Sequence, residues 1–252
     1  MKKTVQIILA CFALFLTGCM KTMEIYSKLP PVNVSVDGQP YDWEKDAYLT
    51  IMNGNLGLGV QNDAENLYVI FALRNRMWAD LMQRSGVYIW VDNTGGYEKQ
   101  FGLRYIGRLK VIEVTKEGSG KPAINDPEAK SDYYFEIEDK LFVKGNEMDH
   151  LEKIMPDGSS GPAAGFNPPT VNNPSYIYEF GIPLSGGKGS YKLSAGQGGT
   201  IGLGIEWGGM DEYTLDRIRQ MLTAGIDPSM VSVPSSRMVW LRVKLAMQEE
   251  KK

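Results

Sequence analysis

Cysteine and histidine are nearly absent from this chain. Its 252 residues include two cysteines and one histidine, and both cysteines, Cys11 and Cys19, fall near the N-terminus. The rest of the chain has no thiol with which to form a disulfide, so its core must be stable without cross-links. The single histidine, His150, lies in a charged stretch without the serine or cysteine arrangement that would predict a catalytic triad.

A strong charge of either sign is also missing. The chain carries 27 Lys and Arg against 30 Asp and Glu, a formal net charge of −3. This mild acidic excess provides no electrostatic footprint for nucleic acid, and we predict no nucleic-acid partner. Helix-forming stretches rich in Ala, Glu, Lys and Leu are scarce, whereas the chain has 28 glycines, 13 tyrosines and 5 tryptophans. This composition favours an all-β fold.

The N-terminal segment has the pattern of an exported precursor. Lys2 and Lys3 precede an apolar run from Val5 to Leu16, which is too short to span a bilayer comfortably. The Leu-Thr-Gly-Cys that follows at 16–19 resembles the lipobox of bacterial lipoproteins. The resemblance implies cleavage before Cys19, acylation of Cys19 (palmitate) and attachment to a membrane of the cell envelope. The outer membrane is favoured because no aspartate follows the cysteine. An ordinary secretory signal with a chance cysteine is the alternative.

The chain divides into four parts on this basis. We expect a signal peptide at 1–18, a tether at 19–31 that ends in two prolines, one β-sandwich domain at 32–247 and a charged tail at 248–252. The sequence shows no internal repeat and no convincing linker, which favours a single domain.

The stretch that organises the domain is Leu67 to Leu73, seven apolar residues in succession. Its β-branched and aromatic residues indicate a strand. Alternate residues of a strand point to opposite faces, and both faces are apolar here, so we expect a central strand covered on each side. We expect further strands at 32–36, 48–52, 56–60, 87–92, 100–105, 109–115, 133–137, 140–143, 176–182, 200–207 and 237–245.

Two short helices are predicted between the strands. The first, 76–84, is expected to face the core with Met77, Leu81 and Trp78. The second, 211–224, ends before Gly225 and carries the apolar stripe Leu215, Ile218 and Leu222. Residues 155–174 are dense in Gly, Pro, Ser and Asn, which is typical of a surface excursion or lid.

Four motifs in order resemble those of family 9 carbohydrate-binding modules. They are Val36-Asp37-Gly38 followed by Trp43, then 62–69, 87–93 and 178–184. The resemblance implies a β-sandwich of jelly-roll type, here with a short inserted helix near the C-terminus, and non-catalytic sugar binding. The excursion at 155–174 and the second helix depart from the compact module. The family's paired sugar-stacking tryptophans have no identified counterpart here.

Candidate sugar-binding residues follow from the alternation of the strands. Aromatic rings stack on sugars, and planar polar side chains hydrogen-bond to their hydroxyls. With Ile89, Leu203 and Leu241 pointing inwards, the opposite face forms a shallow trough over Gly202 and Gly204. The candidates on this face are Tyr88, Trp90, Trp240, Glu206 and Arg242. Trp207, at the strand end beside Gly208 and Gly209, and Trp78 are second-choice stacking residues. In the alternative arrangement, which we favour, the second helix covers this face, because its apolar stripe must be buried somewhere.

Three further assignments stay open. Asp92 with Asn93 is a candidate Ca²⁺ site, although turn chemistry also explains both residues; we predict no other cofactor. Glu179 and Glu206 are the two carboxylates that a glycosidase would need. We instead expect Glu179 to form a structural salt bridge, for example to Arg74, and predict no enzymatic activity. The rival function for the sandwich is a docking or assembly surface for another envelope protein.

Overall fold

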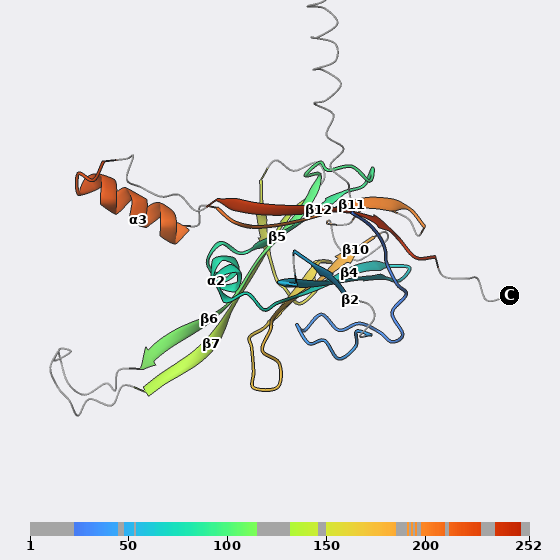
Figure 1. Ribbon diagram of the computed structural model, residues 1–252, viewed down its shortest axis with the longest axis horizontal. Helices are drawn as coiled ribbons and strands as arrows, with labels where there is room; N and C mark the ends of the chain where they lie inside the picture. Colours follow the sequence, from blue (N-terminus) through green and yellow to red (C-terminus); the bar gives the residue numbers. More distant parts are fainter. Residues whose placement is uncertain are drawn as a thin grey trace, which may run out of the picture.

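Two β-sheets packed face to face make up the body of the molecule (Figure 1). The computed structural model describes residues 23–44, 48–52, 54–114, 132–145, 150–184, 191, 193, 195, 198–209, 212–227 and 235–247. The seven-stranded sheet has the order β1-β12-β11-β5-β6-β7-β8 and the five-stranded sheet the order β2-β3-β4-β10-β9. Neighbouring strands are antiparallel except for β1 and β12, which are parallel. The predicted all-β sandwich is therefore confirmed; its jelly-roll type stays a prediction.

The strand bounds follow the sheets. The seven-stranded sheet contains β1 Met23–Tyr26, β5 Val87–Asp92, β6 Phe101–Val114, β7 Asp132–Lys144, β8 Glu152–Ile154, β11 Thr200–Gly208 and β12 Ser236–Lys244. The five-stranded sheet contains β2 Tyr48–Ile51, β3 Leu56–Asn62, β4 Asn66–Leu73, β9 Ala163–Asn167 and β10 Tyr176–Pro183.

Strand β4 occupies the centre of the five-stranded sheet, between β3 and β10. Leu67, Val69, Phe71 and Leu73 point into the main core, and each is fully buried. On its other face, Ile70 packs in a second apolar cluster that includes Tyr68, Trp43 and Ile177. The predicted central strand with two covered faces is thus confirmed.

Aromatic rings join the two sheets across the main core. Phe71 of β4 stacks on Tyr178 and Phe180 of β10 at centroid distances of 5.3 and 5.8 Å. Tyr105 of β6, in the opposite sheet, meets Tyr178 and Phe180 edge-on. Large rings of this kind bury much apolar surface and favour offset or edge contacts. The core is therefore held across the sheets without cross-links.

Helix α2, Arg76–Ser85, closes one end of the sandwich between β4 and β5 (Figure 1). The Asn75 side chain caps it by accepting a hydrogen bond from the Trp78 amide, and Gly86 at φ 76° ends it. Trp78 packs against Trp207 at a centroid distance of 5.6 Å. The predicted inward position of Met77 is wrong, since that side chain is 61% exposed. Trp78 occupies the core side of this turn instead.

Several strand predictions need correction. Met23–Tyr26, which we assigned to the tether, forms β1 by pairing with β12, whereas residues 32–36 form no strand. Residues 155–174 are not a simple excursion, because they contain β9, which pairs with β10. The separate segments expected at 100–115 and 133–143 are two continuous strands, β6 and β7, paired along their length.

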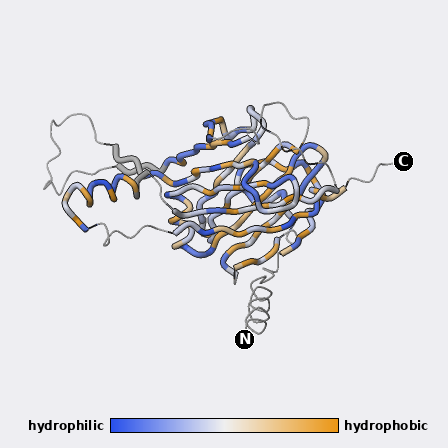
Figure 2. The backbone as a smooth tube through the Cα atoms, turned by 90° about the horizontal axis from the view of Figure 1, so that it is seen from above, coloured by the Kyte–Doolittle hydropathy of each residue, from blue (hydrophilic) through white to orange (hydrophobic). Residues whose placement is uncertain are grey.

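Helix α3, Glu212–Thr223, lies to the side of the sandwich (Figure 2). Its Leu215, Ile218 and Met221 are partly exposed and Leu222 is 43% exposed. The helix stops before Gly225, which has a φ of 78°. The expectation that the apolar stripe of this helix packs on the sheet is therefore wrong. Helix α3 instead borders the outer face of the seven-stranded sheet through Asp216, near Arg104 and Phe142. Among the described helices, none combines the length and apolarity needed to cross a membrane.

Candidate functional site

The outer face of the seven-stranded sheet gathers all five sugar-binding residues predicted to share one face. Antiparallel pairing places Glu206 beside Tyr88, and Gly204 between Trp90 and Trp240. Arg242 pairs with Gly202 on the same face. We call this surface the open face and define it by Tyr88, Trp90, Arg104, Phe142, Glu206, Trp240 and Arg242.

A row of alternating cations and rings crosses the open face. Lys99 Nζ lies 4.9 Å from the centre of the Trp90 ring, and Trp90 stacks on Tyr88 at 5.5 Å with 7° between the planes. Beyond Tyr88, the Arg104 guanidinium lies 5.4 Å from the Tyr88 ring and 5.9 Å from the Phe142 ring. Each contact falls in the range of cation–π or ring stacking. Four strands, β11, β5, β6 and β7, carry or flank this row.

Glu206 fixes one end of the row. Its Oε2 accepts hydrogen bonds from Trp90 Nε1 at 2.7 Å and Lys99 Nζ at 2.5 Å, and its Oε1 accepts one from Ser236 Oγ at 3.3 Å. The Tyr88 hydroxyl has a raised pKa because burial disfavours the phenolate, with Arg104 lowering it and Glu206 raising it. The carboxylate therefore orients the indole and a lysine.

Exposure separates the predicted tryptophans. Trp207 is fully buried beneath Trp78, so its ring has no surface to offer a ligand, and the structure removes it from the candidate set. Its side chain lies on the inner face of β11 with Leu203 and Ile205, as alternation from Glu206 requires. Trp90 is 7% exposed beneath Lys99 and acts as a support. Trp240 is partly exposed and meets the 47% exposed Tyr97 edge-on at 5.8 Å.

The trough predicted over the glycines of β11 is already occupied. A side chain at Gly204 would meet the Trp240 ring at 3.0 Å, and one at Gly202 would meet the Gly96 carbonyl oxygen at 1.9 Å. The indole and the β5–β6 turn thus fill the space that these glycines leave. The surface available to a ligand lies over the rings and cations instead.

Asp92 is built into the β5–β6 turn. Its carboxylate accepts hydrogen bonds from the Thr94 amide and hydroxyl and from the Glu98 amide, at 2.6–2.8 Å. Burial alone would raise its pKa, but these hydrogen bonds hold the pKa below its usual value. The Asn93 amide donates to Gln100. Within the described residues, no three His, Cys, Asp or Glu gather as a metal site. Both residues thus make contacts typical of a turn, and the Ca²⁺ site stays a prediction.

The outer face of the five-stranded sheet is organised differently, around Glu179. This fully buried carboxylate accepts hydrogen bonds from Trp43 Nε1 at 2.7 Å, the Gly38 amide at 2.9 Å and the Asp37 amide at 3.1 Å. The expected salt bridge to Arg74 is therefore wrong; N–H groups satisfy the charge instead. We call this surface the covered face, because the segment 34–43 lies across it.

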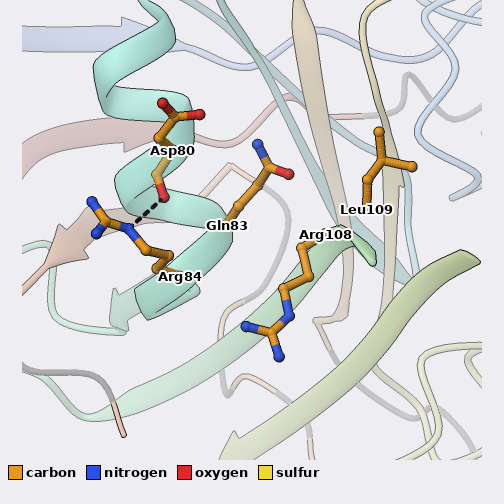
Figure 3. A pocket seen from close by; sticks show the side chains of 5 residues that line it. All are labelled: Asp80, Gln83, Arg84, Arg108 and Leu109. Atoms are coloured by element: carbon orange, nitrogen blue, oxygen red, sulfur yellow. Dashed lines mark hydrogen bonds between the residues drawn. The ribbon is translucent and has the colours of Figure 1, made fainter. Parts of the chain in front are cut away.

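A cationic cavity adjoins the open face and was not predicted. It has a volume of about 530 Å³ and is lined by Arg84, Arg104, Ile106, Arg108, Lys140, Phe142 and Asp216. A neighbouring hollow of about 460 Å³ shares Arg84 and Arg108 with Asp80, Gln83 and Leu109 (Figure 3). Strand alternation in 101–108 and 138–142 puts Arg104, Arg108 and Lys140 on the same side of their strands. Alternation alone does not say that these side chains lie next to one another. The missing information was the register between β6 and β7.

Comparisons with known proteins found a distant likeness among solved structures. A scan against models of protein families found no match, and no curated protein matched the chain. Among solved structures, the chain is similar to a family 9 carbohydrate-binding module from Caldicellulosiruptor kristjanssonii in complex with cellotriose. The TM-score is 0.40 and the identity 11%, over 90% of this chain and 95% of that one. For the same organism's module in complex with glucose, the TM-score is 0.39 and the identity 11%, over 91% and 98%.

Proposed function

We propose that this protein binds a carbohydrate on the open face without chemically changing it. The observation that carries the proposal is the row of rings and cations on this face. Sugar rings present C–H groups that pack on aromatic faces, and their hydroxyls bind carboxylate and guanidinium groups. Trp240, Tyr97, Tyr88 and Phe142 supply the first kind of contact. Glu206, Arg104 and Arg242 supply the second.

The placement of the two glutamates argues against glycoside hydrolysis. Glycosidases hold two carboxyl groups about 5–10 Å apart on either side of one bond. Glu206 lies on the open face and Glu179 on the covered face, with both sheets between them. Stacked sheets alone are spaced about 10 Å apart. Glu179 is also fully buried. The pair therefore cannot flank one glycosidic bond.

A glycan array with aromatic variants tests the proposal. Trp240→Ala and Tyr97→Ala each remove a ring from the pair that lies beside the Trp90 end of the row. We expect each to weaken binding about fivefold, since stacking of this kind contributes about 1 kcal/mol. Tyr41→Ala is the matched control, because Tyr41 is an aromatic residue that is 89% exposed and belongs to the other face. Absence of binding to every glycan by a folded protein would defeat the proposal.

Helix α3 supports a second candidate function, the docking of an envelope protein. Of its apolar stripe, Leu222 is 43% exposed and Leu215, Ile218 and Met221 are half-buried, and none of the four belongs to the core clusters of the sandwich. An exposed apolar stripe marks an interaction surface. Changing Ile218 and Leu222 to Asp would abolish docking and leave glycan binding intact. The opposite result, with glycan binding lost and association kept, would favour the open face as the docking surface.

We further propose that the protein is lipid-anchored in the cell envelope through Cys19, most favourably in the outer membrane. Support comes from the Leu-Thr-Gly-Cys sequence at 16–19 and the basic, apolar segment before it. Cys19 lies outside the described residues. Metabolic labelling with a palmitate analogue tests this assignment. Label in the wild type and none in Cys19→Ser supports it, and equal label in both contradicts it.

A further inference from the structure

The positive charge of the cationic cavity indicates a negatively charged ligand. We propose that the cavity receives an acidic group of the bound saccharide, so that the protein selects sugars bearing carboxylate or sulfate groups over neutral ones. This inference rests on the proposed function, because it specifies the ligand class of the same face.

The charge of the cavity supports an anionic ligand. Arg84, Arg104, Arg108 and Lys140 line it, and Asp216 is the single carboxylate among the lining residues. Glu138 pairs with both Arg108 and Lys140, and these contacts lower its pKa through hydrogen bonds, Lys140 first, against the effect of burial. The cations outnumber the carboxylates even when Glu138 is counted. An anion entering the cavity therefore meets an excess of positive charge in a partly enclosed space, where screening is reduced.

Arg104 is the best-oriented of these cations. Its Nε and Nη2 donate to the Ser85 carbonyl oxygen at 3.1 and 2.8 Å, and its guanidinium lies between the rings of Tyr88 and Phe142. These contacts fix the plane of the guanidinium before any ligand binds. Among the described residues, its hydrogen bonds use those two nitrogens only, which leaves the Nη1 side for an oxyanion. A planar guanidinium held in this way suits carboxylate and sulfate oxygens.

The cavity is continuous with the ring row. Arg104 and Phe142 belong to both, and Ile106 adds apolar surface to the cavity wall. A chain of sugars lying along Trp240, Tyr88 and Phe142 would bring the acidic substituent of one unit over Arg104. The site thus combines aromatic surface, on which sugar rings can stack, with a cationic cavity that can bind an acidic substituent. An acidic saccharide carries both kinds of group.

Nucleic acid is the rival polyanion, and the rest of the molecule disfavours it. The chain has a formal net charge of −3, and Asp216, Glu138 and Glu206 lie within or beside the site. Nucleic-acid binding generally uses a broad basic surface along a polyphosphate backbone. The positive charge here is confined to one cavity, so the site fits a single acidic group better than a polyphosphate backbone.

Matched pairs of polysaccharides test the inference. The full-length protein is titrated calorimetrically with polygalacturonate and its methyl ester, and with dextran sulfate and dextran. We expect the acidic member of at least one pair to bind about tenfold more tightly, and added salt to weaken only that binding. The first pair isolates carboxylate recognition and the second sulfate recognition.

Charge variants locate the effect. Arg104→Gln should reduce affinity for the acidic member about tenfold. Arg84→Gln, at the exposed end of α2, should reduce it less. Arg74→Gln removes the same charge from an exposed position beyond β4 and should change nothing. Circular dichroism verifies each fold.

The outcomes separate this inference from the proposed function. Equal affinity for both members of each pair overturns the inference and leaves carbohydrate binding standing. Binding to no saccharide defeats the proposed function, and the inference with it. An equal loss in Arg74→Gln, or tighter binding of a single-stranded DNA oligonucleotide, overturns the inference in favour of a diffuse field or a nucleic-acid site.

Discussion

The two outer faces of the sandwich carry the same chemical pair in different surroundings. On each face a glutamate accepts a hydrogen bond from a tryptophan indole at 2.7 Å, Glu179 from Trp43 and Glu206 from Trp90. The first pair is buried where the segment 34–43, which includes Trp43, crosses the sheet, and its carboxylate accepts hydrogen bonds from two backbone N–H groups as well. The second pair is bordered by the Lys99 side chain, which is 44% exposed, and by the row of rings on the open face.

The difference separates a pair that builds the fold from one that presents a surface. Glu179 links the turn at Asp37-Gly38 and Trp43 to β10, so residues far apart in the chain converge on one carboxylate. Glu206 instead orients the Trp90 indole by accepting its hydrogen bond, and the Lys99 side chain lies over that ring, where a ligand can contact it. A buried hydrogen-bonded charge is costly to disrupt, while an exposed pair contributes little to stability.

The largest expected effect follows from removing each carboxylate. Glu179→Ala leaves one indole and two backbone N–H groups buried without acceptors, and we expect a loss of about 3–5 kcal/mol in the free energy of unfolding. Glu206→Ala, on the open face, should cost about 1 kcal/mol and weaken glycan binding. Urea unfolding followed by fluorescence measures both. Equal losses in the two variants would contradict the distinction between the faces.

The features that depend on the pattern of residues within a single strand could be predicted from the sequence. Alternation placed Tyr88, Trp90, Glu206 and Trp240 on one face, and the apolar run at 67–73 predicted a central strand. These features depend on neighbours within one strand. The uninterrupted apolar run also predicted a cover over the second face, which is the segment 34–43.

Long-range pairing accounts for what the sequence did not predict. Strand β1 exists because Met23–Tyr26 pair with β12, more than 200 positions away in the chain. The exposure of Trp90 depends on Lys99 and Glu206, and the cavity depends on the register of β6 with β7. The stripe on α3 predicted packing on the sheet because an apolar stripe usually faces a core. Its residues are instead absent from the core clusters of the sandwich, with Leu222 exposed and the others half-buried.

Acid titration sharpens the comparison through Glu179. Burial raises its pKa to about 7 from 4.5, although the indole and amide donors favour the carboxylate and act against that rise. Between pH 4.5 and 7 the folded protein then holds a proton that the unfolded chain has lost, so this group's contribution to stability falls as the pH rises through that window. The expected loss is about 3 kcal/mol.

The measurement is the free energy of unfolding from pH 4.5 to 8 in the wild type and in Glu179→Gln. The variant cannot titrate at this position, so its profile should lack the decline. Asp92 and Glu138, whose pKa values are lowered on folding, are ionised in both states over the upper part of this window and lose their contribution towards its acid end and below, which is the opposite trend. A decline that persists in the variant would mean that other groups cause it.

The smallest expected effects on the free energy of unfolding come from Gly→Ala changes beneath the two indoles, at Gly59 under Trp43 and at Gly102 under Trp90. A side chain at Gly59 would meet Trp43 at 2.9 Å and Ile70 at 2.8 Å, and one at Gly102 would meet Trp90 at 2.3 Å. Trp43 packs in the apolar cluster of the covered face, where a shift would disturb Tyr68 and Ile70, so Gly59→Ala should cost about 2–3 kcal/mol. Trp90 can shift outward by displacing Lys99, whose side chain is 44% exposed, so Gly102→Ala should cost about 1 kcal/mol despite the shorter distance.

Gly57→Ala is the control for these two changes, because its added carbon would meet nothing closer than 3.9 Å. We expect its effect to stay within about 0.5 kcal/mol. Tryptophan emission adds a second readout, since an outward shift of Trp90 moves its indole towards water. A larger loss for Gly102→Ala than for Gly59→Ala would mean that the open face is packed as rigidly as the covered one. A rigid face could not adjust its rings to a ligand, and the role assigned to the row would then rest on shape alone.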